Sequence, residues 1–126
     1  MAETYRPTTG MQSAAKRAIR WKEEGKAKGA GTAVGWTRAG QLARRENLSL
    51  DTVKRMYSYF SRHEVDKQAK GFNSGEEGFP SKGRVMWDAW GGDGGYSWSR
   101  RIAEREQKMW QGSAFSFEKV DNSDNS

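Results

Sequence analysis

The chain has 126 residues and a mass of 14.2 kDa, which is the size of one domain. It contains no cysteine and a single histidine, which excludes disulfides, thiolate zinc ligands, a cysteine nucleophile and any site that needs two histidines. The formal net charge of +6 favours polyanionic partners, because Lys and Arg release counterions when they neutralise phosphates. Residues 1–70 hold 15 Lys and Arg against seven Asp and Glu, so the basic face lies in the first half.

The apolar content sets the expected compactness and location. Only 34% of the residues are hydrophobic, so we expect a compact body with loose ends. Residues 1–10 are predicted to be a flexible arm, 11–110 a single helical domain and 111–126 a disordered polar tail. No apolar run approaches the roughly 20 residues that span a bilayer, and the N-terminus lacks a signal-peptide core. We therefore expect a soluble intracellular protein with no membrane partner.

Apolar spacing predicts a helix from Met11 to about Glu24. Five apolar residues recur there at i, i+3, i+4, i+7 and i+8, which is the pattern of a helix with one buried stripe. Trp21 and the basic side chains fall on the other face, and Thr9 is placed to cap the N-terminus. The segment 25–35, rich in glycine and lysine, is predicted to be a flexible loop.

Two further helices are predicted on either side of Asn47. The first covers 37–46, and Asn47 ends it because asparagine tolerates the left-handed conformation. The second runs from Leu50 to about Val65, with Ser49 as its N-cap and four apolar residues at i, i+3, i+4 and i+7. This second helix has the clearest periodicity in the chain and should lie at the centre of the core.

The last third of the chain predicts two helices around a glycine-rich corner. Residues 66–82 form a connection, a short helix covers about 82–90, and a longer one covers 93–110. Asp93 is placed to cap the longer helix. No pair of strands is evident. The predicted fold class is all-α, with about five short helices, glycine-rich loops and a disordered C-terminal tail.

The pair of helices around Asn47 has the spacing of a helix-turn-helix. That motif needs a small residue, a left-handed residue and a branched apolar residue at positions that Ala43, Asn47 and Val53 fill. Nearby basic and hydroxyl side chains would contact phosphates. Two amphipathic helices joined by a turn also meet these conditions by chance, so a purely structural hairpin stays open. The candidate nucleic-acid-binding residues are Arg44, Arg45, Ser49, Lys54 and Arg55.

A second candidate site surrounds the single histidine. His63 is followed by Glu64 and Asp66, and such groups can bind a metal or act as an acid–base pair. Adjacent helical residues point about 100° apart, so His63 and Glu64 cannot readily share a ligand, and salt bridges at a helix end are the simpler interpretation. The residues to test are Arg62, His63, Glu64, Asp66, Asp88 and Asp93.

The stretch GGDGGYS, residues 91–97, is the candidate phosphate loop. It lacks the lysine of a P-loop and the third glycine of GxGxxG, and a calcium loop needs more oxygen ligands than Asp93 alone. We interpret it as a corner between helices, packed by Trp87, Trp90 and Trp98. The sequence thus predicts no metal and no cofactor.

The chain resembles a small domain of tailed bacteriophages. The resemblance rests on TVKRMYSYFSRHEVDK at 52–67 and on PSKGRVMWDAWGGDGGYSW at 80–98, and it extends from about Met11 to Ile102. Such domains occur alone or fused to head-maturation proteases and other virion proteins. The resemblance carries no catalytic residue. It implies phage origin, a location in the host cytoplasm or the virion, and a role near head assembly or DNA.

Three functions follow from these observations. The first is a non-enzymatic phage accessory protein that binds nucleic acid, DNA rather than RNA, through the basic first half. The second is a virion assembly module that docks on a capsid, portal or protease through exposed Trp21, Trp36 or Trp110. The third is a metal-dependent enzyme that uses His63 and nearby carboxylates.

Overall fold

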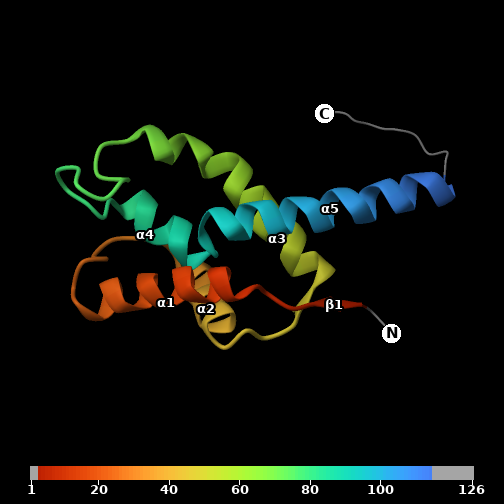
Figure 1. Cartoon of the computed structure of the whole chain (residues 1–126), viewed down its shortest axis with the longest axis horizontal. Coiled ribbons are helices and arrows are strands. Elements are labelled where there is room, and N and C mark those ends of the chain that lie inside the picture. The colour runs from red at the N-terminus through yellow and green to blue at the C-terminus, as the bar shows by residue number, and fades with distance from the viewer. Residues whose placement is uncertain (1–2, 115–126) are drawn as a thin grey trace.

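A computed structural model describes residues 3–114 of the chain, with side chains through Gln107. This part is mostly helical, with five α-helices, one 3₁₀ helix and two very short strands, which confirms the all-α prediction. Figure 1 shows the helices in chain order. The elements are β1 (Thr4–Tyr5), α1 (Thr9–Glu23), α2 (Ala33–Ala43), β2 (Leu48–Ser49), α3 (Leu50–His63), η1 (Glu64–Gln68), α4 (Lys82–Ala89) and α5 (Gly92–Ala114).

Each of the first four α-helices has a hydroxyl side chain as its N-cap. In each case the cap oxygen accepts a hydrogen bond from the backbone N–H three residues on, which satisfies a donor that the helix leaves free. Ser49 caps α3 as predicted, and the cap of α1 is Thr8 rather than Thr9. The four caps are Thr8, Thr32, Ser49 and Ser81.

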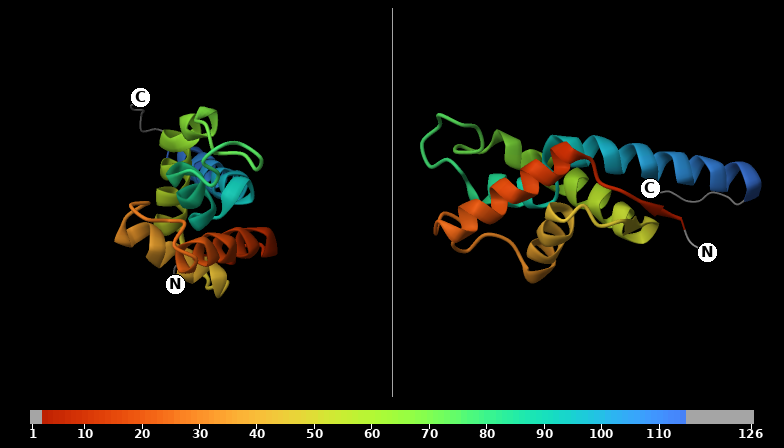
Figure 2. Two further views of the ribbon diagram at one scale, coloured as in Figure 1. Left: turned by 90° about the vertical axis from the view of Figure 1, so that its left-hand side faces the viewer. Right: turned by 60° about the horizontal axis from the view of Figure 1, so that its bottom comes forward.

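The helices pack around one shared core. Helix α1 lies against α2, α4 and α5, and α3 lies along α5. The last turns of α5 extend beyond the other helices (Figures 1 and 2). Trp87 is fully buried at the centre, with its ring edge-on to Phe60 at 4.8 Å, to Tyr96 at 5.8 Å and to Phe72 at 5.9 Å between centroids. Such aromatic pairs contribute about 0.5–1.5 kcal/mol beyond the area they bury.

Helix α2 begins four residues before the predicted start. Gly35 was taken as part of a flexible loop, but it lies in the first turn of α2. A Cβ at this position would lie 2.8 Å from Met86 Sδ and 3.2 Å from Trp90 Nε1, so the glycine lets α2 approach α4 closely. The helix also ends at Ala43 rather than Glu46, and the left-handed residue after it is Arg45, with φ 51°, rather than Asn47.

The N-terminal segment is the main departure from the predicted architecture. No strands were expected, yet β1 pairs with β2 in an antiparallel bridge that aligns Tyr5 with Leu48. Tyr5 is buried and its hydroxyl donates to Glu106 Oε2 at 3.0 Å. At the other end, α5 continues through Ala114, past the predicted boundary at 111, and the rest of the predicted tail lies outside the described residues.

Candidate functional site

Two of the five candidate nucleic-acid-binding residues have structural roles. Arg45 turns back toward the N-terminal segment, and its Nε donates to the Pro7 carbonyl at 2.8 Å. The Ser49 hydroxyl accepts from Thr52 N at 3.2 Å as the cap of α3. Both contacts hold local structure, the N-terminal segment in one case and the start of α3 in the other, so we assign Arg45 and Ser49 structural roles and not a place on a binding surface.

The other three candidates are exposed on the surface. Arg44 forms an ion pair with Glu46, and Arg55 Nη2 lies 3.1 Å from Asp51 Oδ2. Exposed pairs of this kind contribute about 0–1 kcal/mol, so a phosphate can replace the carboxylate at little cost. Lys54 is exposed beside them on α3.

The predicted helix pair is present, but its packing differs from that of a helix-turn-helix. Helices α2 and α3 are joined by residues 44–49. In the DNA-binding motif the second helix packs across the first. Here α2 packs mainly on α1 and α4, whereas α3 packs mainly on α5. The surface of α3 must therefore be considered without the constraints of that motif.

The six charged candidates around His63 divide between two clefts. Arg62, His63 and Asp66 line the first, whereas Asp88 and Asp93 line the second. Glu64 lines neither cleft, and its Oε1 accepts from the Tyr96 hydroxyl at 3.2 Å. Among residues 3–107, no group of three or more His, Asp or Glu is placed to hold a metal ion.

The first cleft, which we call the α3–α4 cleft, has a volume of about 540 Å³. Its walls come from α3, from α4 and from the residues around the start of α2. Basic side chains and one carboxylate share it with apolar and aromatic groups. The lining residues include Arg55, Tyr59, Arg62, Asp66, Lys82 and Trp90.

Aromatic stacking holds one wall of this cleft. The Tyr59 ring stacks on His63 at 4.5 Å and on Trp90 at 4.6 Å between centroids. His63 Nδ1 lies 3.2 Å from Asp66 Oδ2, which fixes the orientation of the imidazole. Over Trp90 lies the guanidinium of Arg38, 5.3 Å from the ring centroid. His63 is therefore part of a stacked wall of the cleft.

Two buried polar atoms next to the α3–α4 cleft have no hydrogen-bond partner. They are the hydroxyl of Tyr59 and Nε of Arg38, and each residue is only 6% exposed. Burial, with a smaller contribution from nearby carboxylates, raises the pKa of the Tyr59 hydroxyl well above its usual value. Burial and the nearby Arg55 lower the pKa of Arg38. Arg38 Nη1 donates to the amide oxygen of Gln41 rather than to a carboxylate.

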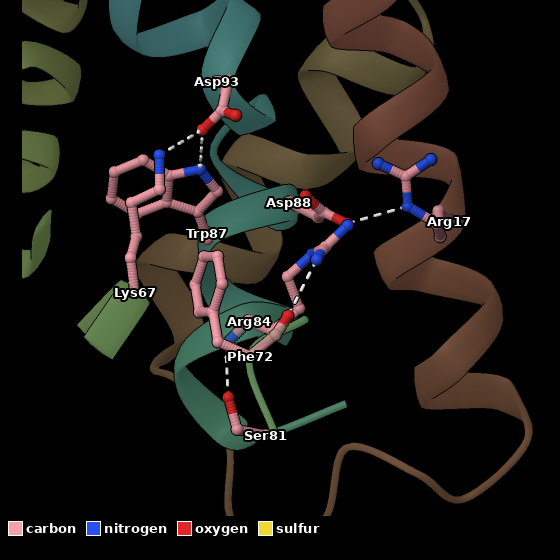
Figure 3. Close-up of polar contacts among 8 residues, drawn as sticks. All are labelled: Arg17, Lys67, Phe72, Ser81, Arg84, Trp87, Asp88 and Asp93. Atoms are coloured by element: carbon pink, nitrogen blue, oxygen red, sulfur yellow. Dashed lines mark hydrogen bonds and ion pairs between the residues drawn. The ribbon is translucent and has the colours of Figure 1, made fainter. Parts of the chain in front are cut away.

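The second cleft contains an ionic network around Asp88 (Figure 3). The Asp88 side chain is 2% exposed, and its Oδ2 accepts from Arg17 Nε at 2.8 Å and from Arg84 Nε at 3.2 Å. Arg84 also donates from Nη1 to the Phe72 carbonyl at 2.8 Å, and its guanidinium lies 5.3 Å from the Phe72 ring centroid. Asp88 thus joins α1 to α4 through two ion pairs of one carboxylate oxygen.

Asp93 is not the helix cap that its position in the sequence suggested. Its Oδ1 accepts from Trp87 Nε1 at 2.9 Å and from Lys67 Nζ at 3.0 Å (Figure 3). Burial opposes ionisation, but these hydrogen bonds prevail and hold the pKa of Asp93 below its usual range. The corner at 91–97 therefore serves to anchor the central indole, which supports its structural interpretation.

Two tryptophans proposed as docking anchors are not free on the surface. Trp21 was expected on the exposed face of α1, but it is 8% exposed and meets Phe79 edge-on at 5.5 Å. Trp36 is half-buried, with Lys22 Nζ 4.6 Å above its ring. The side chain of Trp110 lies outside the described residues. The Trp21 prediction was wrong because Trp21 is the residue of α1 that meets the loop before α4.

Sequence reasoning missed two residues, Tyr59 in the α3–α4 cleft and Arg38 next to it. Arg38 lies on the buried stripe of α2 with Gly35, Ala39 and Leu42, and this spacing was available in the sequence as a sign that the arginine is buried. Tyr59 gave no such sign, because its stacking partner Trp90 is distant in the sequence.

Comparisons of the chain with protein-family models, with curated proteins and with solved structures found no match.

Proposed function

We propose that this protein is a non-enzymatic accessory protein of a tailed bacteriophage that binds nucleic acid. DNA is the preferred partner over RNA, and the protein acts in the host cytoplasm or in the virion. The binding surface is the exposed side of α3 together with the rim of the α3–α4 cleft. No helix of the described part of the chain is long and apolar enough to cross a membrane.

The charge of the cleft is the observation that carries this proposal. Arg55, Arg62 and Lys82 line it together with one carboxylate, that of Asp66. Arg38 adds a buried guanidinium close to Arg55. A cleft lined by one sign of charge, with apolar walls, concentrates the electric potential and attracts polyanions. The basic surface we propose therefore lies along α3 and the start of α4 rather than on the turn before α3.

Fluorescence anisotropy of a labelled DNA duplex tests the proposal. Each phosphate neutralised on B-DNA contributes about −0.9 to the slope of log K against log salt. We expect the double variant Arg55→Gln/Arg62→Gln to make that slope less steep by about 1.8. The matched control is Lys16→Gln/Arg20→Gln, which removes the same charge from exposed positions on α1 and should leave the slope closer to that of the parent protein.

Three results would count against this function. Absence of binding to duplex, single-stranded DNA and RNA at about 50 mM salt removes it altogether. Equal effects of the two double variants would mean that only net charge matters and that the cleft is not the binding surface. Tighter binding to RNA would overturn the preference for DNA. Capture of the tagged protein from infected cells, with and without nuclease, separates nucleic-acid association from docking on virion proteins.

A further inference from the structure

We propose that the α3–α4 cleft is a nucleotide-binding pocket, which takes one base against its apolar wall and one terminal phosphate at its basic rim. The nucleotide is either a free mononucleotide or the end of a strand. This inference rests on the proposed function, because the same rim residues carry both. It goes further in assigning the interior of the cleft, which a duplex backbone cannot enter.

The size and the walls of the cleft suit a planar organic group. Its volume of about 540 Å³ falls within the roughly 300–1,000 Å³ typical of small-molecule sites. Apolar contacts come from Val34, Met86, Trp90 and the edge of Tyr59. Val34 is one of the large hydrophobic side chains that are exposed in the described structure, and it lines the cleft. A base would cover this apolar surface.

The unpartnered hydroxyl of Tyr59 is a second, independent sign of a ligand. Native proteins pair nearly all buried polar groups, so a buried hydroxyl without a partner needs an explanation. Tyr59 lines the cleft, and a tyrosine hydroxyl is protonated at neutral pH because its usual pKa is about 10. The hydroxyl oxygen is closed to solvent, so it can donate a hydrogen bond to a phosphate oxygen or to a ring nitrogen of a bound nucleotide once the side chains around it move aside.

The charge of the rim matches a phosphate monoester. Arg55, Arg62 and Lys82 supply three positive charges, and Asp66 supplies one negative charge. A phosphate monoester carries about −1.5 to −2 at pH 7, which is close to the net charge of +2 that these four residues give once the phosphate replaces the Asp51 carboxylate beside Arg55. Arg62 Nη1 donates to the Ser58 hydroxyl at 2.7 Å, which holds the guanidinium along α3 and leaves its other nitrogens free to bind an anion.

Isothermal titration calorimetry of the full chain with adenosine 5′-monophosphate tests the pocket. We expect saturable binding that Tyr59→Phe weakens about tenfold or more, which is the usual effect of losing a hydrogen bond to a charged group. Arg62→Gln, on an exposed position, should weaken it by a similar factor. Tyr57→Phe is the matched control, because it removes a hydroxyl from α3 outside the cleft and should leave affinity unchanged.

The possible outcomes separate this inference from the proposed function. Duplex binding without nucleotide binding below a Kd of about 1 mM overturns the pocket and leaves the function. Nucleotide binding without binding to DNA or RNA does the reverse, and identifies a free nucleotide as the ligand. Unchanged affinity in both Tyr59→Phe and Arg62→Gln, with normal circular dichroism, also overturns the pocket. Preference for a 5′-phosphorylated oligonucleotide over its 5′-hydroxyl form identifies a strand end as the ligand.

Discussion

Replacing Asp88 with asparagine should destabilise the protein strongly, because its side chain is buried between two arginines. Asn keeps the size of the side chain but removes the negative charge that faces Arg17 and Arg84. Breaking a buried ion pair by removing one partner costs about 3–5 kcal/mol. The side chain of Arg17 is 40% exposed and can be rehydrated, whereas that of Arg84 is 21% exposed and cannot readily be. We therefore expect a loss of about 3 kcal/mol, at the lower end of the range.

The assay is thermal and urea unfolding followed by far-ultraviolet circular dichroism. One kcal/mol shifts Tm by about 4–8 °C in a domain of this size, so Asp88→Asn should lower Tm by at least about 12 °C. The control is Asp51→Asn, which breaks the exposed pair with Arg55 and should change stability by less than about 0.5 kcal/mol. Equal Tm values for the two variants would refute the reasoning that Asp88 joins α1 to α4.

Three further predictions use other contacts. Gly95→Ala should lower the free energy of unfolding in urea by about 1–3 kcal/mol, because its Cβ would lie 2.9 Å from the Trp90 carbonyl oxygen. Gly94→Ala should be neutral or stabilising, because its Cβ would meet only one atom, at 4.0 Å. Asp93→Ala should lower the urea midpoint at pH 7. The pKa of Asp93 is lowered in the folded protein, so its full contribution to the free energy of unfolding is present above the unfolded pKa of about 3.9. The difference in stability between the variant and the parent protein should therefore shrink as pH falls through the folded pKa. A difference that stays constant with pH would contradict this. Tyr59→Phe should leave Tm unchanged or raise it, since the hydroxyl that it removes has no partner, and a large drop in Tm would show a hydrogen bond that the structure lacks.

Local signals explain what could be predicted from the sequence. The five helices were found because apolar spacing and hydroxyl caps are properties of a few consecutive residues. Helix α3 begins at the residue expected, since Ser49 is a cap and Val53, Met56 and Phe60 are buried on one face. The end of α2 was misplaced because Arg45 takes a left-handed conformation that its residue type does not favour.

Contacts between distant residues explain most of what could not be predicted. Arg17 and Asp88 are 71 positions apart, so nothing in the sequence near either residue indicates their ion pair. The same holds for the hydroxyl of Tyr59, whose lack of a partner depends on the packing of three helices. Gly35 misled the prediction for the opposite reason. Its residue type indicates a loop, whereas it lies in the first turn of α2, where the proximity of Met86 leaves little room for a Cβ.

The N-terminal segment has a consequence for how the chain folds during synthesis. Tyr5 leaves the ribosome well before Glu106, because the two residues that its hydroxyl hydrogen bond joins are 101 positions apart. Domains are completed only when their last contacting residues have been made. Strand β1 can pair with β2 earlier, but the contact of Tyr5 with α5 has to wait until α5 has been synthesised. Completion of this contact should be among the last steps of folding.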